Sequence, residues 1–215
     1  MKMIYLLTLV ASLGFACGDA QRMNQANSNS ANHAGMDHSN MNHADSSSSM
    51  PEHSMASSPD AEKAPLELQF LDTMIAHHQG AVDMANLVEA RAQHSEVKEL
   101  AHSIVADQER EIMQMSKWRE QWYGENPKAI NMTFPGMHEG MAGMDTNKLQ
   151  NLTGVDFDIE FLKQMIPHHE GAVTMAKALI AGNAKPEVKE LAGDIVRSQT
   201  AEVAQMKTWR AAWSK

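Results

Sequence analysis

MIAHHQGAVDMA at residues 74–85 returns as MIPHHEGAVTMA at residues 165–176, so a histidine pair flanked by methionines occurs twice, 91 positions apart. The register continues without a gap, because EVKELA follows at residues 96–101 and again at 187–192. Of the 55 positions from 68 to 122, 27 are identical to their counterparts in the second copy. Repetition at a fixed spacing is the signature of a duplicated structural unit. The chain therefore contains two tandem copies of one unit.

Each copy has the residue pattern of two amphipathic helices. Apolar residues with a period of 3.6 predict helices at residues 66–91 and 95–122, and the second copy repeats them at 157–181 and 186–213. Ser95 is the expected N-cap of the second helix. Each copy is therefore predicted to form a helical hairpin.

A long segment separates the two hairpins. Residues 123–155 carry Pro, Gly and Asn and predict an irregular crossover without a further helix. Two hairpins joined by a long crossover predict an all-α fold, a ferritin-like four-helix bundle made of two tandem helical-hairpin repeats. We place this bundle at residues 65–215, with repeat one at 66–122 and repeat two at 156–213.

The N-terminus has the features of a secretion signal at residues 1–17. Lys2 precedes an apolar segment at residues 4–16 that is too short to span a bilayer. Cys17, the only cysteine, follows this segment in the sequence LGFAC, which resembles a bacterial lipobox. We expect export to the periplasm or cell envelope with a lipid anchor on Cys17. The alternative is a plain signal cleaved after Ala16 or Ala20.

Residues 18–64 predict a disordered tether. They consist mainly of Ser, Asn, Ala, His and Met, which cannot bury enough apolar surface to offset the entropy of ordering. Interleaved histidines and methionines indicate metal binding; low-complexity drift is the alternative, but it gives no reason for the methionines. The candidate ligands are His33, Met36, His38, Met41, His43, Met50, His53 and Met55.

The charge and cysteine content of the chain limit the kinds of ligand and partner that it can bind. The formal net charge of −9 argues against a nucleic-acid partner and is compatible with a protein that attracts cations. A single cysteine excludes an intrachain disulfide and a thiolate cluster. Histidine, methionine and carboxylate side chains remain as ligands, so metal ions are the expected partners.

The repeated motif supplies candidate ligands inside the bundle. Neighbouring residues on a helix diverge by about 100°, so one of His77 and His78 is expected to face the bundle axis and the other a helix seam. Met74, His77 and Met84 are expected to line one edge. Gly80 and Gly171 cost about 1 kcal/mol each relative to alanine, which indicates close approach of a neighbouring segment or a ligand. The candidate ligands of the two repeats are Met74, His77, His78, Met84, Glu111, Met115, Met165, His168, His169, Met175, Glu202 and Met206.

Two carboxylates lie on the predicted buried stripes. Glu111 and Glu202 are at equivalent positions, and a buried carboxylate without a partner is costly. A shared metal or hydrogen bonds from the histidines would compensate them. The alternative is a satisfied network of imidazole and carboxylate groups that holds no metal.

The crossover carries its own cluster in the spacing M-H-x-x-M-x-x-M. Its candidate ligands are Met137, His138, Met141 and Met144. Methionine often fills gaps in a core, but the glycines among these residues leave little core to fill. Metal contact is therefore the favoured interpretation.

The doubled motif M-I-x-H-H-x-G-A-V-x-M-A, each copy followed by W-R-x-x-W, resembles the bacterial family known as domain of unknown function 305. The resemblance covers residues 66–213 and implies a ferritin-like fold. It also implies copper binding, because CopM-type members are periplasmic copper binders and the family recurs in copper and silver tolerance. The family motif falls on Met74, His77, His78 and Met84, and on Met165, His168, His169 and Met175.

Three hypotheses of function follow. The first is an exported protein that binds Cu(I), and also Ag(I), for sequestration, resistance or delivery, with copper efflux or oxidase proteins as partners; thioethers select Cu(I), and iron fits less well. The second is a redox enzyme in which His77, His168, Glu111 and Glu202 hold a metal pair. The third is a metal-free structural bundle. Oxygen consumption with Fe(II) or Cu(I) favours the enzyme, and an unchanged melting temperature on metal addition favours the third.

Overall fold

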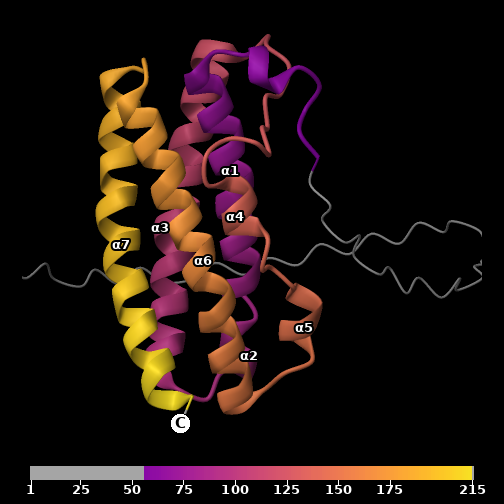
Figure 1. Cartoon of the computed structure of the whole chain (residues 1–215), viewed down its shortest axis with the longest axis vertical. Coiled ribbons are helices and arrows are strands. Elements are labelled where there is room, and N and C mark those ends of the chain that lie inside the picture. Colours follow the sequence, from indigo (N-terminus) through magenta and orange to yellow (C-terminus); the bar gives the residue numbers. More distant parts are fainter. Residues whose placement is uncertain (1–55, 215) are drawn as a thin grey trace, which may run out of the picture. The chain divides into compact units, whose positions relative to one another are not determined.

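Four long helices form the body of the protein (Figure 1). The computed structural model describes residues 56–214. Helices α1 (Leu66–Ala85) and α3 (Ser95–Tyr123) form one hairpin, and α6 (Gly154–Ala181) and α7 (Pro186–Trp213) form the other. The hairpins meet where α1 packs against α6. The predicted all-α bundle of two helical-hairpin repeats is confirmed.

The first predicted helix is shorter than expected. We predicted one helix over residues 66–91, but α1 ends at Ala85 and a separate turn of helix, α2 (Val88–Arg91), follows. At the break, the N–H of Leu87 bonds to the carbonyl of Met84, three residues back, in place of the α-helical partner four residues back. The apolar pattern continues through this break, so periodicity alone did not reveal it.

The crossover is more ordered than predicted. It contains two short helices, α4 (Met137–Met141) and α5 (Thr146–Gln150). The side chain of Asp145 accepts a hydrogen bond from the N–H of Lys148 and so caps α5. Each helix is only 5 residues long, and helices of this length need tertiary contacts to persist. The prediction of a crossover without helices was wrong for that reason.

The ordered part begins before Pro65. Residues 56–64 were assigned to the disordered tether, but they contain the 3-10 turn η1 (Ala61–Lys63) and pair with the crossover. The N–H of Ser58 bonds to the carbonyl of Ile130 at 2.8 Å, and the N–H of Ile130 bonds to Ser58 Oγ at 3.2 Å. The composition of residues 56–64 gave no sign of these long-range bonds.

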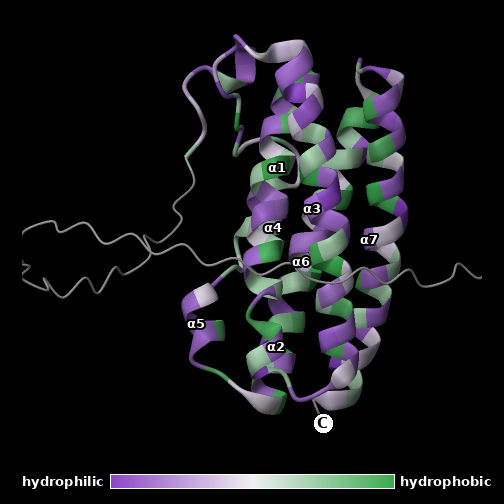
Figure 2. Cartoon of the chain, turned by 180° about the vertical axis from the view of Figure 1, so that it is seen from behind, coloured by the Kyte–Doolittle hydropathy of each residue, from purple (hydrophilic) through white to green (hydrophobic). Residues whose placement is uncertain are grey.

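The apolar faces of the helices form two hydrophobic clusters. Figure 2 shows hydrophobic and hydrophilic residues alternating along the helices, as expected when each helix has one buried face. The first cluster includes Phe157, Phe161 and Leu162, and the second includes Phe70, Leu71 and Phe134. The four tryptophans of the two W-R-x-x-W motifs are partly buried and pack against these clusters.

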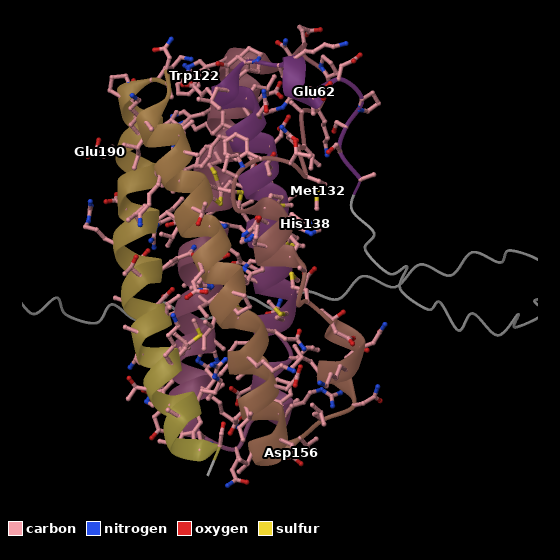
Figure 3. All side chains as sticks on the ribbon, in the orientation of Figure 1. Glu62, Trp122, Met132, His138, Asp156 and Glu190 are labelled. Carbon is pink, nitrogen blue, oxygen red and sulfur yellow. The ribbon has the colours of Figure 1, made fainter. Side chains whose placement is uncertain are left out.

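One end of the bundle is closed by an acid of repeat one and a base of repeat two. Glu67 accepts hydrogen bonds from the N–H and Nζ of Lys185, both at 2.6 Å. Lys185 Nζ also lies 4.3 Å from the ring centroid of Trp122, which Figure 3 places at this end. Burial raises the pKa of the Glu67 carboxyl, but the hydrogen bonds from Lys185 and Tyr123 outweigh it and lower the pKa below 4.5.

At the other end of the bundle, an acid of repeat two pairs with a base of repeat one. The carboxylate of Asp158, fully buried, accepts hydrogen bonds from the N–H groups of Gln93 and His94 and from His94 Nδ1. The His94 ring stacks on Trp213, with centroids 3.8 Å apart. We predicted Ser95 as the N-cap of this helix, but His94 holds that position and makes no side-chain cap. Asp158, distant in sequence, accepts the bonds that a local cap would accept.

Candidate metal centre

Two histidines from different repeats meet at the centre of the bundle. His77 on α1 and His168 on α6 have ring centroids 3.7 Å apart and ring planes inclined by 32°. Both side chains are fully buried. The register that places them together is the repeat itself, because they are the first histidines of the two HH motifs.

The ring nitrogens of this pair have no hydrogen-bond partner. Nδ1 and Nε2 of both His77 and His168 are buried and unpartnered within the described residues. Burial lowers the pKa of both imidazoles well below 6.5, and the neighbouring histidines lower it further. Each ring is therefore neutral and carries one N–H and one lone pair. Buried polar groups normally have partners, so four such nitrogens indicate a place where a ligand binds.

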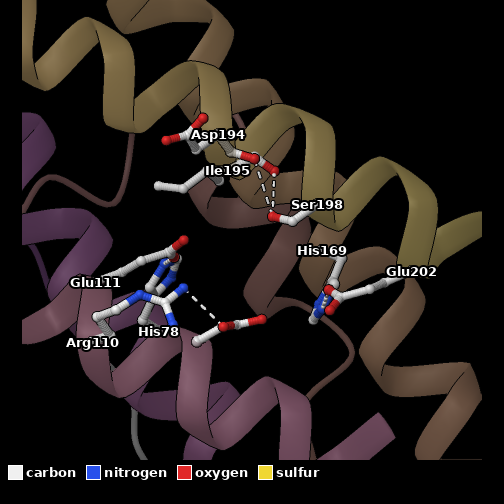
Figure 4. Close-up of polar contacts among 9 residues, drawn as sticks. His78, Arg110, Glu111, His169, Asp194, Ile195, Ser198 and Glu202 are labelled. Carbon is white, nitrogen blue, oxygen red and sulfur yellow. Dashed lines mark hydrogen bonds and ion pairs between the residues drawn. The ribbon is translucent and has the colours of Figure 1, made fainter. Parts of the chain in front are cut away.

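The second histidine of each motif has a different environment. His78 Nε2 lies 2.7 Å from a carboxylate oxygen of Glu111, and His169 Nε2 lies 2.9 Å from one of Glu202 (Figure 4). Each pair joins the two helices of one hairpin, α1 to α3 and α6 to α7. The predicted divergence of adjacent histidines is confirmed: one faces the opposite repeat, and the other faces the seam of its own hairpin.

These pairs separate the carboxylates from the central histidines. The enzyme hypothesis required His77, His168, Glu111 and Glu202 to share metals. Within residues 56–214, no group of three or more His, Cys, Asp or Glu side chains could hold a metal ion. That predicted set is not brought together. Sequence reasoning placed Glu111 on a buried stripe correctly, whereas Glu202 is only partly buried. It could not tell which histidine each carboxylate would meet.

Six predicted methionine ligands are fully buried and divide between the two clusters. Met74, Met115 and Met175 belong to the second cluster, and Met84, Met165 and Met206 belong to the first. Each cluster therefore mixes methionines of both repeats. Met74 packs into the second cluster and Met84 into the first, on either side of His77 in the sequence of α1.

The crossover passes beside the central histidines. A Cβ on Gly140 of α4 would lie 2.6 Å from His77 Nε2, and a Cβ on Gly80 would lie 3.4 Å from His168 Nε2 and 3.2 Å from Met144 Sδ. The glycines of the helices thus admit a neighbouring segment, as predicted. Gly140 is the residue that sequence reasoning missed, because no local signal in the crossover places it against His77.

The four predicted crossover ligands do not converge on one point. Met137 is fully buried in the second cluster, and Met141 packs against the same cluster. His138 is exposed on the outer side of α4 (Figure 3), and Met144 packs against the first cluster. Met144 lies near a central histidine, because a Cβ on Gly80 would be close to both Met144 Sδ and His168 Nε2.

The tether ligands, His33 through Met55, lie outside the described residues, as do the signal segment and Cys17. Among the helices that the structure describes, none combines the length and apolarity needed to cross a bilayer.

Comparison with known proteins gives the family. The model of the family described as domain of unknown function (DUF305) matches residues 16–86 and 67–210. The chain belongs to the DUF305 family, as the resemblance predicted. A curated relative, an uncharacterized protein of Acanthamoeba polyphaga mimivirus, is 41% identical over 51 residues, and the match spans 34% of that protein's length.

Solved structures agree with the fold. CopM in its Cu(II)-bound form is 42% identical, with a TM-score of 0.60 over 68% of this chain and 97% of CopM. CopM has also been solved in Cu(I)-bound, Ag-bound and apo forms. A DUF305 protein from Streptomyces coelicolor is 31% identical, with a TM-score of 0.61 over 69% of this chain and 92% of that protein.

Proposed function

We propose that this protein is exported and binds Cu(I) and Ag(I) through imidazole and thioether ligands. The observation that carries the proposal is the buried pair of His77 and His168, whose four ring nitrogens have no partner. An unsatisfied buried polar group costs about 1–3 kcal/mol, and a metal ion would remove that cost at each ring nitrogen that carries a lone pair.

The donor set favours a soft monovalent ion. Two neutral imidazoles lie in a core that contains fully buried methionines from both repeats. Thioethers select Cu(I), and imidazole binds copper well, whereas iron sites favour carboxylates. The two carboxylates that the enzyme hypothesis assigned to a metal, Glu111 and Glu202, are engaged by His78 and His169. CopM, solved in Cu(II)-, Cu(I)- and Ag-bound forms, supports the binding of copper or silver.

The proposal also covers where the protein is located and what it does with the bound ions. A signal at residues 1–17 exports the chain to the periplasm or cell envelope, and Cys17 carries a lipid anchor. The Streptomyces coelicolor relative, described as secreted, supports export. The His/Met tether captures ions and the bundle holds them, for sequestration, resistance or delivery to copper efflux or oxidase proteins.

Metal loading of the mature protein tests the proposal. Cu(I) and Ag(I) should bind with defined stoichiometry in elemental analysis and chelator competition, and they should raise the melting temperature. A ligand at 100 times its Kd stabilises the native state by about 2.7 kcal/mol. Fe(II) should give no such stabilisation. An unchanged melting temperature with Cu(I) and Ag(I) would refute binding in the bundle, and catalytic oxygen consumption with either Fe(II) or Cu(I) would favour the redox enzyme.

A further inference from the structure

The two central histidines have different surroundings although the repeats are equivalent. Beside His168 Nε2, the space left by Gly80 of the opposite repeat is bordered by the thioether of Met144: a Cβ on Gly80 would lie 3.2 Å from Met144 Sδ and 3.4 Å from His168 Nε2. A sulfur donor and an unpartnered imidazole nitrogen therefore border one small space.

Backbone fills the equivalent space in the other half. A Cβ on Gly171, the counterpart of Gly80, would lie 2.6 Å from Gly140 Cα and 3.0 Å from Gly140 N. A Cβ on Gly140 would in turn lie 2.6 Å from His77 Nε2. The α4 backbone thus closes the space beside His77, and no methionine sulfur is among the nearest atoms there. The single crossover breaks the twofold symmetry of the duplicated site.

We infer that the bundle has one asymmetric site for a soft monovalent ion, with His168 Nε2 and Met144 Sδ as ligands. This rests on the proposed function, the binding of Cu(I) and Ag(I) by the bundle. Thioether and imidazole together suit such an ion, and both ring nitrogens of His168 are buried without a hydrogen-bond partner among the described residues. The His77 ring lies against the His168 ring, with centroids 3.7 Å apart, and His77 acts as a positioning residue.

Nuclear magnetic resonance on the full chain tests the assignment, with Ag(I) alone as the probe. Methionine methyl groups and histidine ring nitrogens report each residue separately, so tether ligands do not obscure the result. Ag(I) should shift the Met144 methyl and His168 Nε2 resonances strongly and His77 Nε2 weakly. Met144→Leu, which conserves volume, should remove the His168 shift. Met113→Leu is the matched control, because Met113 is 66% exposed, and it should leave the shift unchanged.

Two glycine substitutions, one beside the site and one as its control, give a second test that leaves both ligands in place. Gly80→Ala puts a methyl between the donors and displaces the flexible end of Met144, while alanine favours the helix. It should remove the Ag(I)-induced shift of His168 without lowering the melting temperature. Gly143→Ala is the control, since a Cβ there meets no atom within 4 Å.

The outcomes separate the inference from the proposed function. Equal Ag(I)-induced shifts at His77 and His168 that persist in Met144→Leu would overturn the asymmetric site and leave the proposed function intact. No shift at either histidine in the wild-type chain would overturn both. A Gly80→Ala variant whose His168 responds to Ag(I) as in the wild type would also overturn the asymmetric site.

Discussion

His94 and Lys185 lie 91 positions apart, at the same place before the second helix of their repeats, and each binds an acid of the opposite repeat. Asp158 of repeat two pairs with His94, and Glu67, the counterpart of Asp158 in repeat one, pairs with Lys185. The base in each case also lies over the last tryptophan in the second long helix of the other repeat. Each repeat therefore completes the helix start of the other.

Asp158→Ala should destabilise the fold strongly. The change leaves His94 without its partner and the N–H groups of Gln93 and His94 without an acceptor. Breaking a buried pair costs about 3–5 kcal/mol, which urea unfolding will measure. Glu170→Ala is the control: its ion pair with Lys207 is exposed, and exposed pairs contribute about 0–1 kcal/mol. Equal losses in the two variants would contradict this account.

The double change His77→Leu and His168→Leu should keep or raise the stability of the metal-free protein. It replaces buried, unpartnered imidazoles by apolar side chains of similar size, which is close to neutral or favourable. It should also abolish stabilisation by Cu(I).

His78→Ala should instead lower the stability of the metal-free protein, because it leaves Glu111 unpaired, at a cost of about 3–5 kcal/mol. Thermal unfolding with and without Cu(I) distinguishes the cases; a double variant that melts far below wild type without metal would show that the pair is structural.

The stability of the metal-free protein should fall as the pH drops below about 6.5, the ordinary pKa of histidine. Burial holds the pKa of His77 and His168 well below that value in the fold. Below pH 6.5 the unfolded chain therefore binds more protons than the native protein, and stability rises with pH across this range. Two such groups contribute a slope of up to about 2.7 kcal/mol per pH unit. Urea unfolding between roughly pH 8 and pH 5, the window set by these shifts, measures how the free energy of unfolding changes with pH. This pH dependence should be weaker in the His77→Leu/His168→Leu variant than in the wild type. An identical pH dependence in the two proteins would exclude these two groups as the cause.

Removal of residues 1–55 should leave the bundle folded and lower its copper capacity. Among the described residues, Ser57 Oγ accepts the N–H of Met132, so a start at Pro65 would remove this contact with the crossover. The deleted segment carries 4 histidines and 4 methionines between His33 and Met55. Circular dichroism checks the fold and chelator competition counts the ions. Unchanged Cu(I) stoichiometry would show that the tether captures no ions.

Cys17→Ser should release the protein from membranes. A lipid on Cys17, followed by the tether, would hold the bundle near a bilayer, and serine cannot carry that lipid. Fractionation of cells expressing each form measures the change. Wild-type protein that is wholly soluble and begins at another residue would exclude the anchor.

Local and repeated features could be predicted from the sequence. The doubled motif and the 3.6-residue period gave the two hairpins, and the 100° offset between neighbouring residues separated His77 from His78. These inferences depend on helix geometry alone, which is the same in every protein.

Contacts between distant segments could not be predicted. Nothing near His94 in sequence indicates that its helix start is capped by Asp158, and nothing near Gly140 indicates that it lies against His77. The short helices of the crossover depend on the same packing. Periodicity reports which face of a helix is buried, but it does not report what lies opposite that face.

The exchange of caps between the repeats has a consequence for how such a protein could arise. A single repeat would begin its second helix with unsatisfied N–H groups and would need a second molecule to supply the missing acid, so its folding would depend on concentration. Fusion of two copies makes that encounter intramolecular, at an effective concentration that dilution does not change. A fused pair is also free to diverge, because each half is encoded separately, and the linker that joins them can place a thioether in one half alone.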